Sequence, residues 1–197
     1  MSQTVSVVVP VRNERQRLPS LLAALHGQTH LPNEVIFVDS GSTDGTADWL
    51  REQAAQQPFA LRVESITQAS IPAALNAGIA AAKSDVIIRL DGHCAPYPDY
   101  IARCLAVLHE TDAANVGGLW DVQPGAAGSL AAGIALAVSS PLGAGDALYR
   151  IGAGRGAANT DTVPFGCFYR TTWQTLGGYD EPLLTNEDYE FNLRIRQ

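Results

Sequence analysis

Residues 5–14 read Val-Ser-Val-Val-Val-Pro-Val-Arg-Asn-Glu, and this stretch sets the pattern for the fold. Its valines are interrupted only by Ser6, which predicts a strand at Val5–Val9 that is covered on both faces. A leucine-striped helix is expected next, ending near His26. A second Val-rich strand is expected at Val35–Val38. This order of strand, helix and strand is the first unit of a parallel sheet.

The same alternation continues through the first half of the chain. It predicts a helix reaching about Gln56, a strand at Leu61–Ile66, a helix at Pro72–Ala82 and a strand at Val86–Leu90. Four strands joined by helices imply a parallel sheet with helices on both faces. Because ligands of such sheets bind beyond the carboxyl ends of the strands, functional residues are expected just after each strand.

The second half follows a less regular pattern. We expect, in order, a helix at Asp99–Leu108, a strand at Asn115–Trp120, a helix at Ala126–Val138, a Gly-rich loop at Gly143–Gly156, a strand at Val163–Tyr169, a helix at Thr171–Leu176 ended by Gly177-Gly178, and a last helix over Tyr189–Gln197. No repeat or linker divides the chain, which predicts one domain over residues 1–197. Because the sequence stops within its last helix, we expect a piece of a longer protein.

Charge and cysteine content exclude some classes of protein. The net charge is −7, from 13 Lys and Arg against 20 Asp and Glu, and no basic block is present to bind nucleic acid. The cysteines, Cys94, Cys104 and Cys167, follow no metal or disulfide spacing, so buried free thiols are expected. Without a signal peptide in the sequence, the cytoplasm is the expected compartment.

An uncharged stretch separates Asp121 from Asp146. It is rich in Ala and Gly and contains Pro124 and Pro141, which makes it a poor membrane span. Two interpretations of its helix stay open, since small residues suit both. The helix either packs against protein or lies in a membrane interface.

Segment 38–46 reads Val-Asp-Ser-Gly-Ser-Thr-Asp-Gly-Thr. Asp39 directly follows a strand, where its carboxylate can accept hydrogen bonds from a nucleotide base or from ribose hydroxyls. Taken alone, helix capping explains Ser42–Asp44 better than ligand binding does. The glycines fit neither a dinucleotide-binding fingerprint nor a phosphate-binding loop.

Two further segments carry acids. Asp91 and His93 follow Arg89 at the end of a strand, where carboxylate and imidazole can bind Mg²⁺ or Mn²⁺. The alternative is a plain turn with an exposed histidine. Glu187 and Asp188 begin a helix, where one can serve as a general base. Alternatively, they satisfy the helix dipole, and Thr185 forms a capping box with Asp188.

The order and spacing of these segments resemble the GT-A fold of family 2 glycosyltransferases, which are inverting enzymes with nucleotide-sugar donors. The matching segments are residues 7–14, Asp39–Thr46, Leu75-Asn76-Ala77-Gly78, Asp91-Gly92-His93, Gly177–Glu181 and Glu187-Asp188. The resemblance covers essentially the whole chain. It implies a Rossmann-like α/β fold of the nucleotide-diphospho-sugar transferase type, a three-layer sandwich around a mostly parallel sheet.

The resemblance also implies roles for individual residues. The nucleotide-sugar pocket would be formed by Pro10, Asn13, Glu14, Asp39, Ser40, Asp44, Asn76, Arg89 and Asp91. Asp91 and His93 would hold a divalent cation, Mg²⁺ or Mn²⁺. Asp188 would be the catalytic base, with Glu187 on the acceptor side. Residues 1–94 would bind the donor, and residues 95–197 would bind the acceptor and complete catalysis.

Two motifs depart from the family pattern. The usual Asp-Asp-Gly-Ser reads Asp-Ser-Gly-Ser at residues 39–42, and the usual Asp-x-Asp reads Asp-Gly-His at residues 91–93. The latter, with Asn-Glu-Asp-Tyr-Glu at residues 186–190, is similar to the ExoA-like branch of succinoglycan-type exopolysaccharide enzymes. The departures put the identity of the metal in question.

The implied reaction moves a hexose from a UDP-sugar to a hydroxyl of a saccharide or lipid-linked saccharide in exopolysaccharide or cell-surface glycan synthesis. The uncharged stretch would then lie on the acceptor side, where it either contacts lipid at the cytoplasmic face of a membrane or packs on the sheet. The alternatives are a domain that binds nucleotide-sugar without transfer, a nucleotidyltransferase and a nicotinamide-dependent oxidoreductase. The last two lack their Gly-rich loops here.

Overall fold

The computed structural model describes residues 3–145, 147–151 and 157–197. Its centre is a five-stranded sheet in the order β3-β2-β1-β4-β5. The strands are β1 (Val5–Val11), β2 (Glu34–Asp39), β3 (Ala60–Ser65), β4 (Val86–Arg89) and β5 (Cys167–Tyr169). The first four are parallel, and β5 pairs antiparallel with β4, so the predicted mostly parallel sheet is confirmed.

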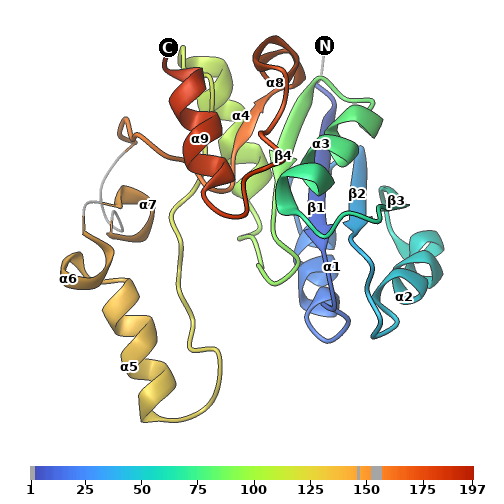
Figure 1. The fold of residues 1–197 in the computed structure, drawn as a ribbon, viewed down its shortest axis with the longest axis horizontal. Coiled ribbons are helices and arrows are strands. Elements are labelled where there is room, and N and C mark those ends of the chain that lie inside the picture. Colours follow the sequence, from blue (N-terminus) through green and yellow to red (C-terminus); the bar gives the residue numbers. More distant parts are fainter. Residues whose placement is uncertain (1–2, 146, 152–156) are drawn as a thin grey trace.

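Helices cover both faces of this sheet (Figure 1). The helices among the described residues are α1 (Leu18–His26), α2 (Thr46–Gln53) with a 3₁₀ turn η1 (Ala54–Gln56), α3 (Ile71–Ala81), α4 (Tyr100–Glu110), α5 (Ser129–Val138), α6 (Pro141–Ala144), α7 (Leu148–Ile151), α8 (Arg170–Leu176) and α9 (Glu187–Ile195), and the core clusters include residues of α1, α2, α3, α4 and α9. The predicted α/β sandwich of three layers is therefore confirmed.

Successive side chains along each strand point to opposite faces of the sheet, so the hydrophobic core consists of two clusters, one on each face. Odd-numbered valines of β1 pack with α1 and α4, whereas Val8 packs with α3 and α9. Strand β4 follows the same rule, with Val86 and Ile88 on the first face and Ile87 on the second. The next residue with the orientation of Ile87 is Arg89.

A glycine brings α3 close to the sheet. A Cβ atom on Gly78 would lie 2.5 Å from Val8 Cγ1 and 3.0 Å from Val38 Cγ2. Ser70 caps the helix by accepting a hydrogen bond from the Ala73 amide at 3.4 Å, and Pro72 lies in its first turn, as predicted. The first turn of α3 is therefore fixed next to the carboxyl ends of β1 and β2.

Two local predictions are wrong. Residues 115–120 join the described part of the sheet only through a bridge between Val116 and Cys167, because the chain beyond it turns Trp120 between Tyr149 and Phe165. No Thr185 capping box forms either. Asn186 occupies the N-cap of α9 with a left-handed φ of 62°, and no side chain caps the helix among the described residues.

Helix α5 does not pack on the sheet. Figure 1 shows it projecting away from the sandwich, and Leu130, Ile134 and Leu136 are between 57% and 78% exposed. Within α5, whose residues are all described, only Ala135 is buried. The interpretation as an Ala-rich helix packed on the sheet is therefore wrong, and the membrane-interface interpretation stays a prediction.

The expected loop at 143–156 contains the end of α6 and all of α7, and residues 146 and 152–156 lie outside the described residues. None of the helices formed by the described residues combines the length and apolar character needed to cross a membrane. Cys104 and Cys167 are buried free thiols, as predicted, and Cys94 is half-buried. Burial raises the pKa of Cys94 to about 12.

Candidate active site

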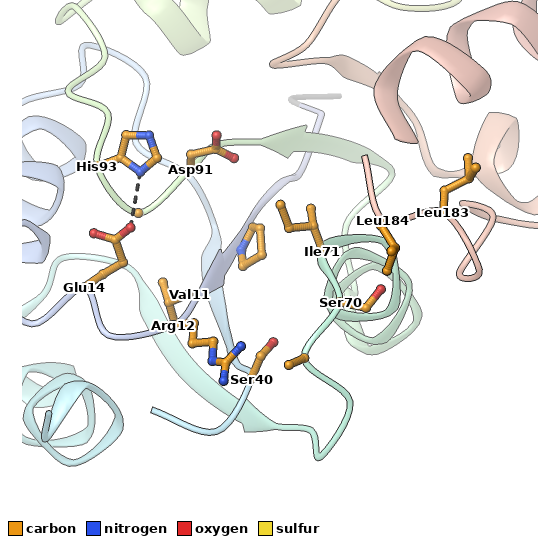
Figure 2. Close-up of a pocket in the computed structure, with 13 residues that line it drawn as sticks. Val11, Arg12, Glu14, Ser40, Ser70, Ile71, Asp91, His93, Leu183 and Leu184 are labelled. Atoms are coloured by element: carbon orange, nitrogen blue, oxygen red, sulfur yellow. Dashed lines mark hydrogen bonds and ion pairs between the residues drawn. The ribbon is translucent and has the colours of Figure 1, made fainter. Parts of the chain in front are cut away.

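A cavity of about 350 Å³ opens at the carboxyl ends of β1, β2 and β4 (Figure 2). Its lining includes five residues that the sequence assigned to the donor or metal site, namely Pro10, Glu14, Ser40, Asp91 and His93. The remaining lining residues are Val11, Arg12, Ala69, Ser70, Ile71, Gly92, Leu183 and Leu184. The topology thus brings together loops that are far apart in the sequence, at the edge where ligands of such sheets bind.

Glu14, Asp91 and His93 form one side of this cavity (Figure 2). His93 Nδ1 lies 3.3 Å from Glu14 Oε1, and the Asp91 side chain is 26% exposed. Gly92 permits the close approach of the two loops, since a Cβ there would meet Glu14 Cγ at 3.2 Å. The result is a polar rim with two carboxylates and one imidazole.

This rim fits a divalent cation only in part. Among the described residues, no group of three or more His, Cys, Asp or Glu side chains is gathered tightly enough to hold a metal ion. Asp91 and His93 offer one oxygen and one nitrogen ligand, a set that suits Mn²⁺ or Mg²⁺. They fit a cation whose other ligands come from a diphosphate and water.

Side-chain hydrogen bonds join the loop after β1 to the loop after β2. Asn13 Oδ1 accepts from the Thr43 amide at 2.8 Å, and the Asn13 amide donates to Ser42 Oγ at 2.9 Å. Asp44 accepts from the Arg15 amide at 3.1 Å and from the Thr46 hydroxyl at 2.6 Å. The Thr46 hydroxyl is the main cause of the lowered pKa of Asp44. Asn13 and Asp44 thus brace the site and do not line the cavity.

Asp39 precedes the lining residue Ser40 and has an unused acceptor, although it does not itself line the cavity. The residue is 5% exposed, and its Oδ2 accepts a hydrogen bond from the Ser42 amide at 3.1 Å. Its Oδ1 is buried and finds no hydrogen-bond partner among the described residues. An unsatisfied buried carboxylate oxygen is costly, and a ligand that donates a hydrogen bond would remove that cost.

Asn76 has no such free position. Its Oδ1 accepts from Trp173 Nε1 at 3.0 Å and from the Tyr179 amide at 2.8 Å. Its Nδ2 donates to the Tyr179 carbonyl at 2.9 Å and to Glu181 Oε1 at 3.0 Å. All four hydrogen-bonding positions of the amide are therefore used within the chain. The structure does not support the predicted donor contact and instead gives Asn76 a structural role, joining α3 to the loop after α8.

A buried arginine connects the cavity rim to α9. Arg89 is 5% exposed, and its Nη2 donates to Glu187 Oε1 at 2.8 Å and lies 3.6 Å from Asp91 Oδ1. Burial opposes its charge, but Asp91, Tyr179, Glu187 and Asp188 outweigh burial and raise the pKa of Arg89. Glu187 is buried, whereas Asp188 beside it is half-buried. Neither Arg89 nor the two acids of α9 lines the cavity formed by the described residues.

Several lining residues had no prediction. Arg12 lies within residues 5–14, and its charge beside an expected nucleotide pocket was a usable signal. Ser70 and Ile71 enter the cavity because the capped end of α3 faces it. Leu183 and Leu184 come from the loop before α9, and no spacing in the sequence marks them.

The mostly parallel sheet between two layers of helices defines the class of the fold, which is GT-A. The family described as "Glycosyl transferase family 2" matches residues 6–144. The chain belongs to this family.

One curated relative covers nearly the whole chain. The succinoglycan biosynthesis protein ExoA of Rhizobium meliloti is 31% identical over 193 residues, which are 96% of this chain and 57% of that protein. The chain therefore spans little more than half the length of this relative. The match confirms that the sequence lies close to the ExoA-like branch of the family.

Solved structures agree on the fold. The mannosyltransferase PcManGT of Pyrobaculum calidifontis, in complex with GDP-Man and Mn²⁺, has a TM-score of 0.73 at 22% identity. The superposition covers 99% of this chain and 52% of the PcManGT chain. The S. aureus protein TarS, residues 1–349 in complex with UDP, has a TM-score of 0.70 at 16% identity, covering 98% and 54%. At these identities the likeness establishes the fold.

Proposed function

We propose that this glycosyltransferase moves a hexose from a nucleotide-diphospho-sugar to a hydroxyl of a saccharide or lipid-linked saccharide, with inversion at the anomeric carbon. The observation that carries the proposal is the contact of one guanidinium with acids from both sides of the site. Arg89 lies 3.6 Å from Asp91 and 2.8 Å from Glu187, the neighbour of Asp188. This contact supports the proposal, because it connects a donor-side acid to the residue that precedes the candidate base.

In this proposal, Asp188 is the general base. Its carboxylate accepts the proton of the acceptor hydroxyl as the oxygen attacks the anomeric carbon, and the bond to the diphosphate breaks. Asp91 and His93 would hold a divalent cation, which neutralises charge on a leaving diphosphate. A leaving group stabilised in this way needs no acid catalyst, so one carboxylate suffices.

The donor we propose is a UDP-sugar. The buried Asp39 Oδ1 lacks a donor among the described residues, and an imide N–H of uracil or a ribose hydroxyl would supply one. The fold accommodates more than one nucleotide, since TarS was solved with UDP and PcManGT with GDP-Man. Asp39, Ser40, Glu14 and Pro10 would surround the nucleotide, with Arg12 as a cation near the diphosphate.

The acceptor we propose is lipid-linked, as part of exopolysaccharide or cell-surface glycan synthesis at the cytoplasmic face of a membrane. The name of ExoA places that relative in succinoglycan biosynthesis. Helix α5 exposes Leu130, Ile134 and Leu136, and no charged residue lies between Asp121 and Asp146. An uncharged, apolar surface of this kind is compatible with peripheral contact with lipid.

A thermal-shift screen tests the donor. UDP-glucose, UDP-galactose, UDP-GlcNAc and GDP-mannose are each added with Mn²⁺, with Mg²⁺ or with EDTA. A ligand that binds only the folded state stabilises it by about 2.7 kcal/mol at a hundredfold excess over Kd. The melting temperature rises as a result. We expect the largest shift with a UDP-sugar and Mn²⁺. A shift without sugar transfer to any acceptor would favour the alternative of a binding domain.

A further inference from the structure

We propose that Arg89 is a positioning residue that holds the first turn of α9, and with it Asp188, in register with Asp91 during sugar transfer. This inference rests on the proposed function and concerns how its two halves are aligned. It assigns Arg89 a role different from the nucleotide contact expected from the sequence.

The backbone places Arg89 for this role. Alternation along β4 sends its side chain to the same face as Ile87, where α9 packs. Its amide donates to the Gly166 carbonyl at 2.9 Å, which ties the end of β4 to the segment before β5. The guanidinium thus starts from a fixed strand and reaches the first residue of α9 at 2.8 Å.

The charges make Arg89 the centre of this group. One guanidinium lies 3.6 Å from Asp91 Oδ1 and 2.8 Å from Glu187 Oε1, and Asp188 is the next residue of α9. Glu187 is 6% exposed, so this ion pair is buried. Removing one member of a buried ion pair leaves the other uncompensated, which is strongly unfavourable. Loss of the arginine would therefore drive Glu187, and the turn that carries Asp188, out of place.

The surrounding chain does not satisfy every donor of Arg89. Its Nε and Nη1 are buried and have no hydrogen-bond partner among the described residues. Such donors are costly, so the pairing with Glu187 does not by itself account for a buried arginine here. Because Arg89 is buried and does not line the cavity, direct contact with the donor does not explain the cost either.

A matched control exists elsewhere in the sheet. Arg62 on β3 donates to the buried Glu34 at 3.2 Å, and this pair lies at the opposite ends of the strands, next to the start of β2. Arg62→Met breaks a similar ion pair without touching the site. The comparison of Arg89→Met with Arg62→Met therefore separates the cost of a broken pair from a loss of alignment.

The test measures steady-state transfer by the full chain from UDP-glucose with Mn²⁺ to a panel of alkyl glucosides and undecaprenyl-linked hexoses. For Arg89→Met we expect kcat to fall about 100-fold, the loss typical of a reacting group displaced by about 1 Å, with KM for UDP-glucose within about threefold. Arg89→Lys should recover part of kcat. Arg62→Met should lower the melting temperature but keep kcat within about threefold.

The possible outcomes are distinct. A parent protein that transfers no sugar overturns the proposed function and this inference with it. A parent that transfers sugar, combined with near-normal kcat in Arg89→Met, overturns the positioning role only. A large rise in KM for UDP-glucose would show direct donor binding instead. If Arg89→Met fails to fold, Glu187→Gln provides the same test, since it removes the charge of the partner and keeps its shape.

Discussion

Residues 3–94 and the described residues after 94 differ in how they are held together. In the first part, β1 and β2 are buried almost throughout, and the loops that follow them are joined by side-chain hydrogen bonds. In the second part, α5 and the fully exposed Leu142 of α6 lie away from the sandwich. Helix α9 is the exception, since it packs on the sheet through Phe191. Under the proposed function, the donor site would be preformed and the acceptor side would depend on further contacts.

The comparison extends to individual ion pairs. Both parts contain a buried glutamate paired with an arginine from the sheet, Glu34 with Arg62 and Glu187 with Arg89. Glu34 also accepts hydrogen bonds from Ser6 and from the Lys83 amide, both at 2.7 Å. Arg89, by contrast, retains two unpartnered donors within the described structure. The two ion pairs therefore differ in how fully their side chains are satisfied by the surrounding chain.

The largest effect is expected at α9. Asp188→Asn should reduce transfer by about 10²–10⁴-fold, because the amide cannot accept the proton of the acceptor hydroxyl. Binding of UDP with Mn²⁺, measured by calorimetry, should stay near that of the parent, since Asp188 does not line the donor cavity. Near-normal transfer by this variant would rule out Asp188 as the base.

A smaller effect is expected at the rim of the donor cavity. Asp91→Ala should weaken binding of UDP in the presence of Mn²⁺ by about 10- to 100-fold, because it removes a metal ligand. The control is Asp99→Ala, which breaks an exposed pair with Arg103. Equal affinity for UDP with Mn²⁺ and with EDTA in the parent protein would contradict the metal proposal.

The exposed helix α5 allows a test in the second part of the molecule, where we expect contact with lipid. Leu130→Glu and Leu136→Glu should each reduce co-sedimentation with phosphatidylglycerol vesicles by about tenfold, because each removes a side chain able to enter the interface. Leu31→Glu changes a leucine of the first part that is 41% exposed and should bind vesicles like the parent. Unchanged binding by both α5 variants, or no binding by the parent, would contradict lipid contact.

The smallest effect concerns the stability of the first part. Burial opposes ionisation of Glu34, but hydrogen bonds from Ser6, Lys83 and Arg62 outweigh burial and lower the pKa of Glu34 below its usual 4.5. A lowered pKa gives stability that is present above the usual pKa and is lost as the pH falls through the folded value. Glu34→Gln should lower the melting temperature at pH 7 by about 3 °C. Calorimetry should show this difference shrinking below pH 4.5, and a constant difference would contradict the assignment.

The sequence predicted the sheet well because burial on both faces leaves an unmistakable run of valines and isoleucines. The stripe of α1 is equally clear, and Leu18, Leu21, Leu22 and Leu25 are all buried. Prediction failed at residues 115–120, since an apolar segment does not reveal whether it has a partner along its length. The helix α5 was predicted, but its sequence left two environments open, because Ala and Gly do not specify what covers them.

The candidate site was predicted where a residue type and a strand end coincide, as for Asp91 and Ser40, which the cavity places as expected. Side-chain partners far apart in the chain carry no such signal. Asn76 lies in a motif of the family, yet its amide bonds to residues about a hundred positions away. Leu184 reaches the cavity because of the path taken by the loop before α9. Hydrophobic periodicity predicts helices and strands but not the path of a loop.

Gly78 has a consequence for substrate choice. The first turn of α3 supplies Ser70 and Ile71 to the cavity, while the distance of that helix from the sheet is set two turns later, where Gly78 meets Val8 and Val38. The width of the cavity therefore depends on the absence of a Cβ atom at residue 78, which lets α3 lie close to the sheet. Relatives that differ there could accept donors of another size without any change in the residues that touch the sugar.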